Sequence, residues 1–96
     1  MVALITVNDL KLRLSQNKPI FLLDVRQLDE YNQFNLGGTL IPLDQLEQRS
    51  QEIPKDKAIV VYCHSGYRSH IAAQWLLTQG FVDVANLQGG ILAWGS

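Results

Sequence analysis

The residue types best suited to chemistry are gathered in one short stretch, VVYCHSGYRSH, which covers residues 60–70. It holds Cys63, the only cysteine of the chain, directly after a run of apolar residues. Gly66 can take a positive φ angle, so the chain after Cys63 can curl tightly with its N–H groups pointing inward. Such a ring of amides at the start of a helix favours a negative charge. Cys63 is therefore expected to ionise readily and to act as a nucleophile.

The other side chains of this stretch have more than one expected role. Arg68 adds a permanent positive charge, which either attracts an anionic substrate or fixes the loop to neighbouring acidic groups. The hydroxyls of Ser65 and Ser69 are expected to contact the sulfur or to cap the next helix, and capping is preferred for Ser69. His64 is expected on the exposed rim, with a role as an acid as the alternative. The candidate site is Cys63 with the loop His64, Ser65, Gly66, Tyr67, Arg68 and Ser69, in which Tyr67 lines the entrance.

The spacing between Cys63 and Arg68 indicates which electrophile the thiol would attack. Four residues separate them, whereas the loops of tyrosine phosphatases place five between the cysteine and the arginine. The shorter loop forms a tighter ring, which suits one extra sulfur atom on the cysteine better than a bound phosphate. A phosphatase or an arsenate reductase is an alternative, although no second cysteine is present to resolve a reductase intermediate. An inert core position for the thiol is a further alternative.

Strands and helices that alternate along the chain must position this loop. Apolar runs rich in β-branched residues predict strands at residues 19–25, 58–63 and 83–87. Apolar periodicity and helix-start signals predict helices from Thr6 as N-cap and over residues 28–34, 44–53 and 69–79. In the last of these, Ile71 and Trp75 are expected to face the core. This alternation indicates an α/β fold with a mainly parallel sheet, in which ligands bind beyond the carboxyl ends of the strands.

Two charged residues, Asp24 and Arg26, follow another predicted strand and are expected to face the same cleft. We interpret them as an ion pair that fixes loops around the candidate site. A buried pair of this kind contributes more to positioning than to net stability. Trp75 and Trp94 are expected to be core residues and not platforms for a ligand.

Composition and length exclude several classes of protein. A chain of 96 residues with 47% apolar residues fits one domain with a packed core. The net charge of −1 and the absence of a Lys/Arg cluster argue against nucleic acid and membrane partners. No apolar run is long enough to span a bilayer and no secretory signal is evident, so a cytoplasmic location is expected. The single cysteine excludes an intrachain disulfide and a multi-cysteine zinc site, and no metal or cofactor is expected.

Several segments together resemble one known family. CHSGYRS (63–69) resembles the active-site loop of the rhodanese family, and LLDVR (22–26), DEY (29–31) and the GGxxAW ending within residues 72–94 match further elements of it. The resemblance implies a single rhodanese domain over residues 1–96, with three layers: about five mainly parallel strands flanked by helices on both faces. One segment, FNLGGTLIP (34–42), departs from the family pattern: Asn35 stands where most members carry histidine.

The resemblance also implies an activity. Members of the family are sulfurtransferases of the thiosulfate:cyanide type, in which a cysteine, here Cys63, carries a sulfane sulfur as a persulfide between a donor such as thiosulfate and a thiol or cyanide. The expected partners are a small sulfur donor and a thiol acceptor, either a small thiol or a thioredoxin-like protein, with the chain as a monomer or a weak dimer. A persulfide relay or binding module that serves a protein partner is the alternative.

Overall fold

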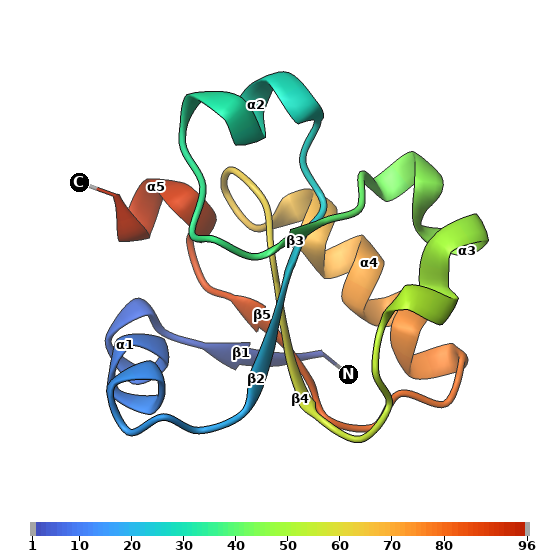
Figure 1. Cartoon of the computed structure of the whole chain (residues 1–96), viewed down its shortest axis with the longest axis horizontal. Coiled ribbons are helices and arrows are strands. Elements are labelled where there is room, and N and C mark those ends of the chain that lie inside the picture. Colours follow the sequence, from blue (N-terminus) through green and yellow to red (C-terminus); the bar gives the residue numbers. More distant parts are fainter. Residues whose placement is uncertain (1, 96) are drawn as a thin grey trace.

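The computed structural model describes residues 2–95 and shows a five-stranded sheet in which all neighbouring strands are parallel (Figure 1). The strand order is β1-β5-β4-β2-β3. The strands are β1 (Ala3–Ile5), β2 (Ile20–Asp24), β3 (Thr39–Leu40), β4 (Ala58–Tyr62) and β5 (Val84–Leu87). The two central strands pair in register, with Leu23 opposite Val61. The predicted α/β fold with a parallel sheet is confirmed.

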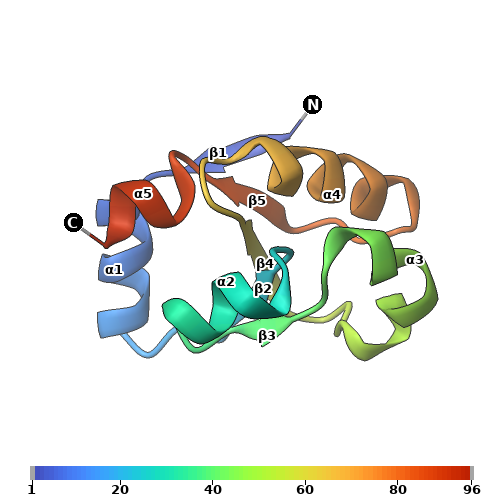
Figure 2. The ribbon, with the colours of Figure 1, turned by 90° about the horizontal axis from the view of Figure 1, so that it is seen from above.

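Helices cover both faces of this sheet, as Figure 2 shows. The helices are α1 (Val7–Ser15), α2 (Leu28–Gln33), α3 (Leu46–Arg49), α4 (Tyr67–Thr78) and α5 (Gly90–Trp94), with 3₁₀ turns at Leu43–Gln45 and Ser50–Glu52. The α3 and α4 helices lie on one face, α1 and α5 lie on the other, and α2 lies over the carboxyl ends of the central strands (Figures 1 and 2). No helix within residues 2–95 is both long and apolar enough to cross a membrane.

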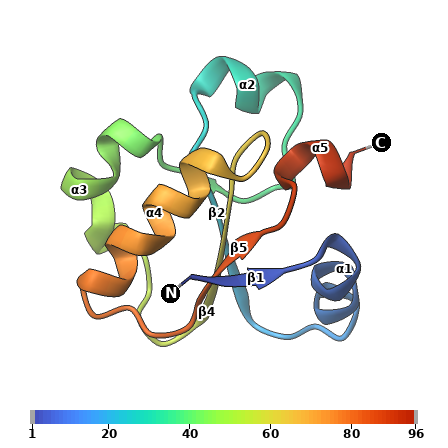
Figure 3. The same ribbon diagram turned by 180° about the vertical axis from the view of Figure 1, so that it is seen from behind.

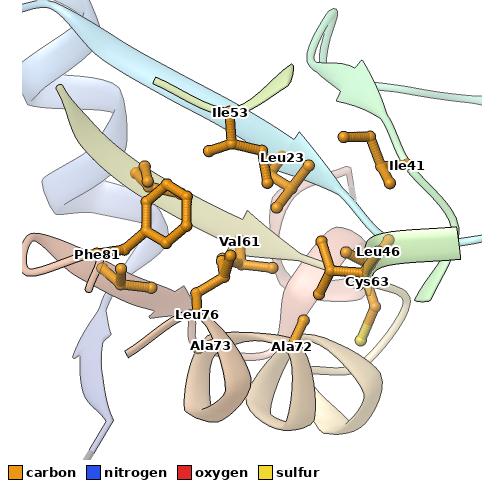
Figure 4. Packing of buried hydrophobic residues seen from close by; sticks show 13 residues of the cluster. Leu23, Ile41, Leu46, Ile53, Val61, Cys63, Ala72, Ala73, Leu76 and Phe81 are labelled. Atoms are coloured by element: carbon orange, nitrogen blue, oxygen red, sulfur yellow. The ribbon is translucent and has the colours of Figure 1, made fainter. Parts of the chain in front are cut away.

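Each face of the sheet has its own apolar core. Leu10 of α1 and Ile91 of α5 pack on one face, against Val60 and Tyr62 of β4. On the other face Leu76 of α4 packs with the remaining members of a larger cluster, which includes Cys63 at its edge (Figure 4). The alternation of β4 side chains between the two clusters follows from the two-residue period of a strand. The carboxyl end of β4 therefore leads directly into the predicted site.

Four details differ from the sequence-based expectations. The edge strand β1, visible beside β5 in Figure 3, was not predicted, since three residues are too few to show a period. The helix predicted at 44–53 is broken into α3 and two flanking 3₁₀ turns. The α4 helix begins at Tyr67, two residues earlier than predicted, and Ile71 is 39% exposed and not part of the core. The small residues Ala72 and Ala73 face the sheet instead.

A buried tyrosine hydroxyl is a packing imperfection in the core on the α1 and α5 face of the sheet. Tyr62 is fully buried, and its Oη has no hydrogen-bond partner among the described residues. A Cβ atom added to Gly38 would lie 2.5 Å from this Oη, so the loop before β3 packs tightly on the ring. Tyr31, by contrast, donates from its Oη to the carbonyl oxygen of Gly38 at 3.0 Å. The two tyrosines therefore meet at one glycine, but only one makes a hydrogen bond there.

We expect Tyr62→Phe to raise the free energy of unfolding by about 1 kcal/mol, because it removes a buried hydroxyl without a partner. The matched Tyr31→Phe variant loses a hydrogen bond and should lower that free energy by about 1 kcal/mol. Urea denaturation followed by circular dichroism measures both values. Destabilisation by Tyr62→Phe would show that the hydroxyl is satisfied in solution.

Candidate active site

The site is built around the sulfur of Cys63, which follows β4 directly. The residue is buried, with 1% of its surface exposed, yet its sulfur faces hydrogen-bond donors. The amide nitrogen of Gly66 lies 3.1 Å from Sγ, and the amide nitrogen and Oγ of Ser69 both lie at 3.4 Å. In Figure 4 the sulfur projects from the apolar cluster toward the start of α4. The geometry therefore differs from that of an inert core thiol, which would be surrounded by carbon atoms alone.

These contacts set the ionisation of the thiol. Burial is the largest single influence and raises the pKa of Cys63. The opposing hydrogen bonds come from the Ser69 hydroxyl and from the amides of Ser69, Gly66 and Ser65, and together they bring the pKa below its ordinary value. Hydrogen bonds to the thiolate are thus the main stabilising influence, as the ring of amides expected from the sequence implies.

Two residues shape the loop so that its donors converge. Gly66 is the N-cap of α4 and has φ of 109°, the positive angle expected from the sequence. Ser69 does not cap the helix, and the expectation that it does is wrong. It is fully buried in the first turn of α4, because residues 69, 72, 73 and 76 form the stripe that faces the sheet. From there its hydroxyl proton has two acceptors within reach, Cys63 Sγ at 3.4 Å and Asn86 Oδ1 at 2.5 Å, and it can donate to only one of them at a time.

Sequence reasoning missed Asn86. This buried residue of β5 accepts from Ser69 and donates from Nδ2 to the carbonyl oxygen of Gly66 at 3.1 Å. It thereby ties β5 to the two residues that contact the sulfur. A signal was available in the sequence, since Asn86 stands within a predicted strand. A side-chain amide buried in a sheet requires a hydrogen-bond partner.

The start of α5 supports the loop from behind. The amides of Ile91 and Leu92 donate to the carbonyl oxygens of Cys63 and His64, at 2.9 and 3.1 Å. A Cβ atom on Gly90 would lie 2.5 Å from the Cys63 oxygen, so this approach requires glycine. Because the C=O and N–H of a trans peptide point in opposite directions, these bonds turn the amides of the loop toward the sulfur.

Arg68 pairs with Glu30 of α2. Its Nη1 and Nη2 each lie 2.8 Å from one carboxylate oxygen. This is the second of the two roles expected for Arg68, fixation of the loop to an acidic group. Hydrogen bonding to Arg68 lowers the pKa of Glu30 to about 2. Since the folded value lies below the ordinary one, the stabilisation from this pair is complete above about pH 4.5 and is lost as the pH falls toward 2.

Asp24 and Arg26 form the expected ion pair, and both are buried. The carboxylate of Asp24 accepts from Arg26 Nη2 at 2.7 Å and from Nε at 2.9 Å. Arg26 also donates to the carbonyl oxygens of Glu30 at 3.3 Å and Phe34 at 2.6 Å. The pair therefore holds α2, and through α2 it holds the partner of Arg68.

The remaining predicted residues lie on the rim. His64 and Ser65 are exposed, and Tyr67 has 74% of its surface exposed. Ser65 contributes its backbone amide to the sulfur.

Asn35 orders the loop before β3: its Nδ2 donates to the Tyr31 carbonyl and its Oδ1 accepts from the Gly37 amide, at 3.0 and 2.8 Å.

Comparisons with known proteins agree with this geometry. The family model of the rhodanese-like domain matches residues 6–96. A protein named Sulfurtransferase from Allochromatium vinosum is 40% identical over 95 residues, which cover 98% of this chain and 89% of that protein. Thiosulfate sulfurtransferase GlpE from Coxiella burnetii is 34% identical over 82 residues, which cover 84% of this chain and 77% of that protein. Two relatives from Bacillus subtilis are longer, and the chain spans 49% of one and 60% of the other.

A solved structure of a rhodanese-like domain protein is also similar to this chain. The rhodanese-like domain protein from Staphylococcus aureus has a TM-score of 0.89 at 30% sequence identity, with 100% of this chain and 93% of that chain covered. The family match extends over almost all described residues and includes the Cys63 loop, α2 and α5. The chain belongs to the rhodanese-like domain family.

Proposed function

We propose that the protein is a sulfurtransferase that carries a sulfane sulfur on Cys63 as a persulfide. The observation that carries this proposal is the set of N–H and O–H donors from Gly66 and Ser69 that converge on Cys63 Sγ. Such donors favour the thiolate, which is the nucleophilic form of cysteine. The names of the relatives from Allochromatium vinosum and Coxiella burnetii support the same class of reaction.

The reaction proceeds in two half-reactions. The thiolate of Cys63 attacks the outer sulfur of thiosulfate, the S–S bond of the donor breaks, and sulfite leaves with the bonding electron pair. The enzyme then holds a Cys63–S–S⁻ persulfide. Cyanide or a thiolate then attacks the terminal sulfur, and the S–S bond to Cys63 breaks. The acceptor leaves as thiocyanate or as a new persulfide, and Cys63 returns to the thiolate. Amides of the loop stabilise the terminal sulfur in the manner of an oxyanion hole.

A sulfur relay to a protein acceptor uses the same persulfide and is the second candidate. The exposure of Tyr67 on the rim of the loop favours it, since a large exposed aromatic residue beside the sulfur suits contact with a protein surface. A phosphatase is disfavoured by the pairing of Arg68 with Glu30, because the guanidinium is already engaged by a carboxylate and is not free to bind a phosphate.

Treatment with thiosulfate should add one sulfur, about 32 Da, to the intact protein, because attack by the thiolate leaves a stable persulfide. Intact-protein mass spectrometry measures the gain, and cyanide or dithiothreitol should reverse it. Cys63→Ser is the control and should gain nothing. If wild type gains no mass from thiosulfate or any other sulfane donor, the proposal is wrong.

Ser69→Ala should raise the pKa of Cys63, because the variant removes one hydrogen-bond donor to the thiolate while the cysteine stays buried. The midpoint of the pH profile for alkylation by iodoacetamide should move to higher pH. The rate of persulfide formation at pH 7 should fall by about tenfold or more.

Ser65→Ala is the matched control for this prediction. It also removes a loop hydroxyl, but Ser65 reaches the sulfur through its backbone amide. Its alkylation profile should therefore coincide with that of wild type. Equal profiles for all three proteins would show that the Ser69 hydroxyl does not set the reactivity of the thiol.

A further inference from the structure

The two arginines near the Cys63 loop are both neutralised. Arg26 is paired with Asp24, and Arg68 is paired with Glu30. The six other Lys and Arg side chains are engaged or located elsewhere: Lys55 donates to the Gln79 carbonyl, Arg49 pairs with Glu52, Lys11 lies 4.9 Å from the Trp94 ring centroid, and Arg13, Lys18 and Lys57 lie together beside the first residues of β2 and β4. A substrate that approaches Cys63 therefore meets no uncompensated Lys or Arg among these contacts.

This arrangement bears on the charge of the sulfur donor. Thiosulfate is a dianion at neutral pH, and it must approach a thiolate. The carboxylate of Glu30 cancels the charge of Arg68, which would otherwise offset this repulsion. A donor with a single negative charge suffers less repulsion, and its transferable sulfur still meets the amides of the loop.

We propose that Glu30 is a specificity-determining residue, which by holding Arg68 makes the Cys63 loop prefer monoanionic sulfane donors, such as thiosulfonates and persulfides of small thiols, over dianions. This inference rests on the proposed sulfurtransferase function and names the class of donor that the same site takes.

Glu30 is well fixed for this role. Its Oε1 accepts from the Gln27 amide at 3.0 Å in a capping box at the start of α2. Arg26 holds the same helix through the carbonyl oxygens of Glu30 and Phe34. The pKa of about 2 keeps the carboxylate ionised at neutral pH. Glu30 is therefore fixed by contacts beyond its pair with Arg68, in which the two side chains are 30% and 32% exposed.

Methanethiosulfonate and thiosulfate are matched probes, since a methyl group replaces one charged oxygen. In each case the Cys63 thiolate forms an S–S bond to the outer sulfur, and the S–S bond of the donor breaks. The leaving groups are methanesulfinate and sulfite, which carry away one and two negative charges. Both donors leave the same Cys63 persulfide, so the gain of one sulfur reports both reactions on the same scale.

The test compares the second-order rate constants of persulfide formation for both donors by quenched mass spectrometry. In Glu30→Gln the amide oxygen preserves the capping box, but the charge of Arg68 is no longer cancelled. The ratio of the methanethiosulfonate constant to the thiosulfate constant should fall by about tenfold relative to wild type. Added salt should accelerate thiosulfate in wild type, and this acceleration should be weakened in the variant.

Two further variants serve as controls. Glu52→Gln makes the same change of charge in the exposed Arg49–Glu52 pair and should leave the ratio at the wild-type value. The double variant Glu30→Gln/Arg68→Met removes both charges and should restore the wild-type ratio. If Glu30→Gln leaves the ratio unchanged while both donors load Cys63, this inference is overturned and the sulfurtransferase function stands. If neither donor loads wild type, the proposed function itself fails.

Discussion

The structure depends on a sulfur atom that is buried and yet surrounded by hydrogen-bond donors. Burial alone would make Cys63 a poor nucleophile, because a low-dielectric environment disfavours the thiolate. The donors at the start of α4 reverse this effect, with Gly66 and Ser69 as the nearest. The two amides among them are available because the first N–H groups of a helix have no intrahelical partners. The reactivity of the thiol thus depends on the start of α4, next to which the end of β4 places Cys63.

The surrounding elements maintain this arrangement by contacts to the backbone. The α5 helix holds the carbonyl oxygens of Cys63 and His64, and Asn86 of β5 holds that of Gly66. On the other side, Arg68 reaches α2 through Glu30. The loop is therefore fixed by α5, by α2 and by the strand β5. In the proposed sulfur transfer, this preorganisation would spare any rearrangement when negative charge moves along the sulfur chain.

Much of the fold and the centre of the site could be predicted from the sequence, because local patterns specify them. Apolar runs marked the three central strands, Gly66 marked the turn, and Asp24 and Arg26 were close enough in sequence to be recognised as a pair. Glu30 and Asn86 escaped prediction because their partners, Arg68 and Ser69, are distant in sequence and are brought near only by the packed sheet. Ser69 was assigned as a cap because its place on the buried stripe of α4 depends on where the helix starts.

The dependence of the loop on α5 has a consequence for the order in which the protein becomes active. Residues 63–69 leave the ribosome before residues 90–92, whose amides and missing side chain turn the loop inward. Until the first turn of α5 docks, the carbonyl oxygens of Cys63 and His64 lack these partners, and the loop is not held in its folded orientation. Docking of α5 and activation of the thiol are in this sense coupled.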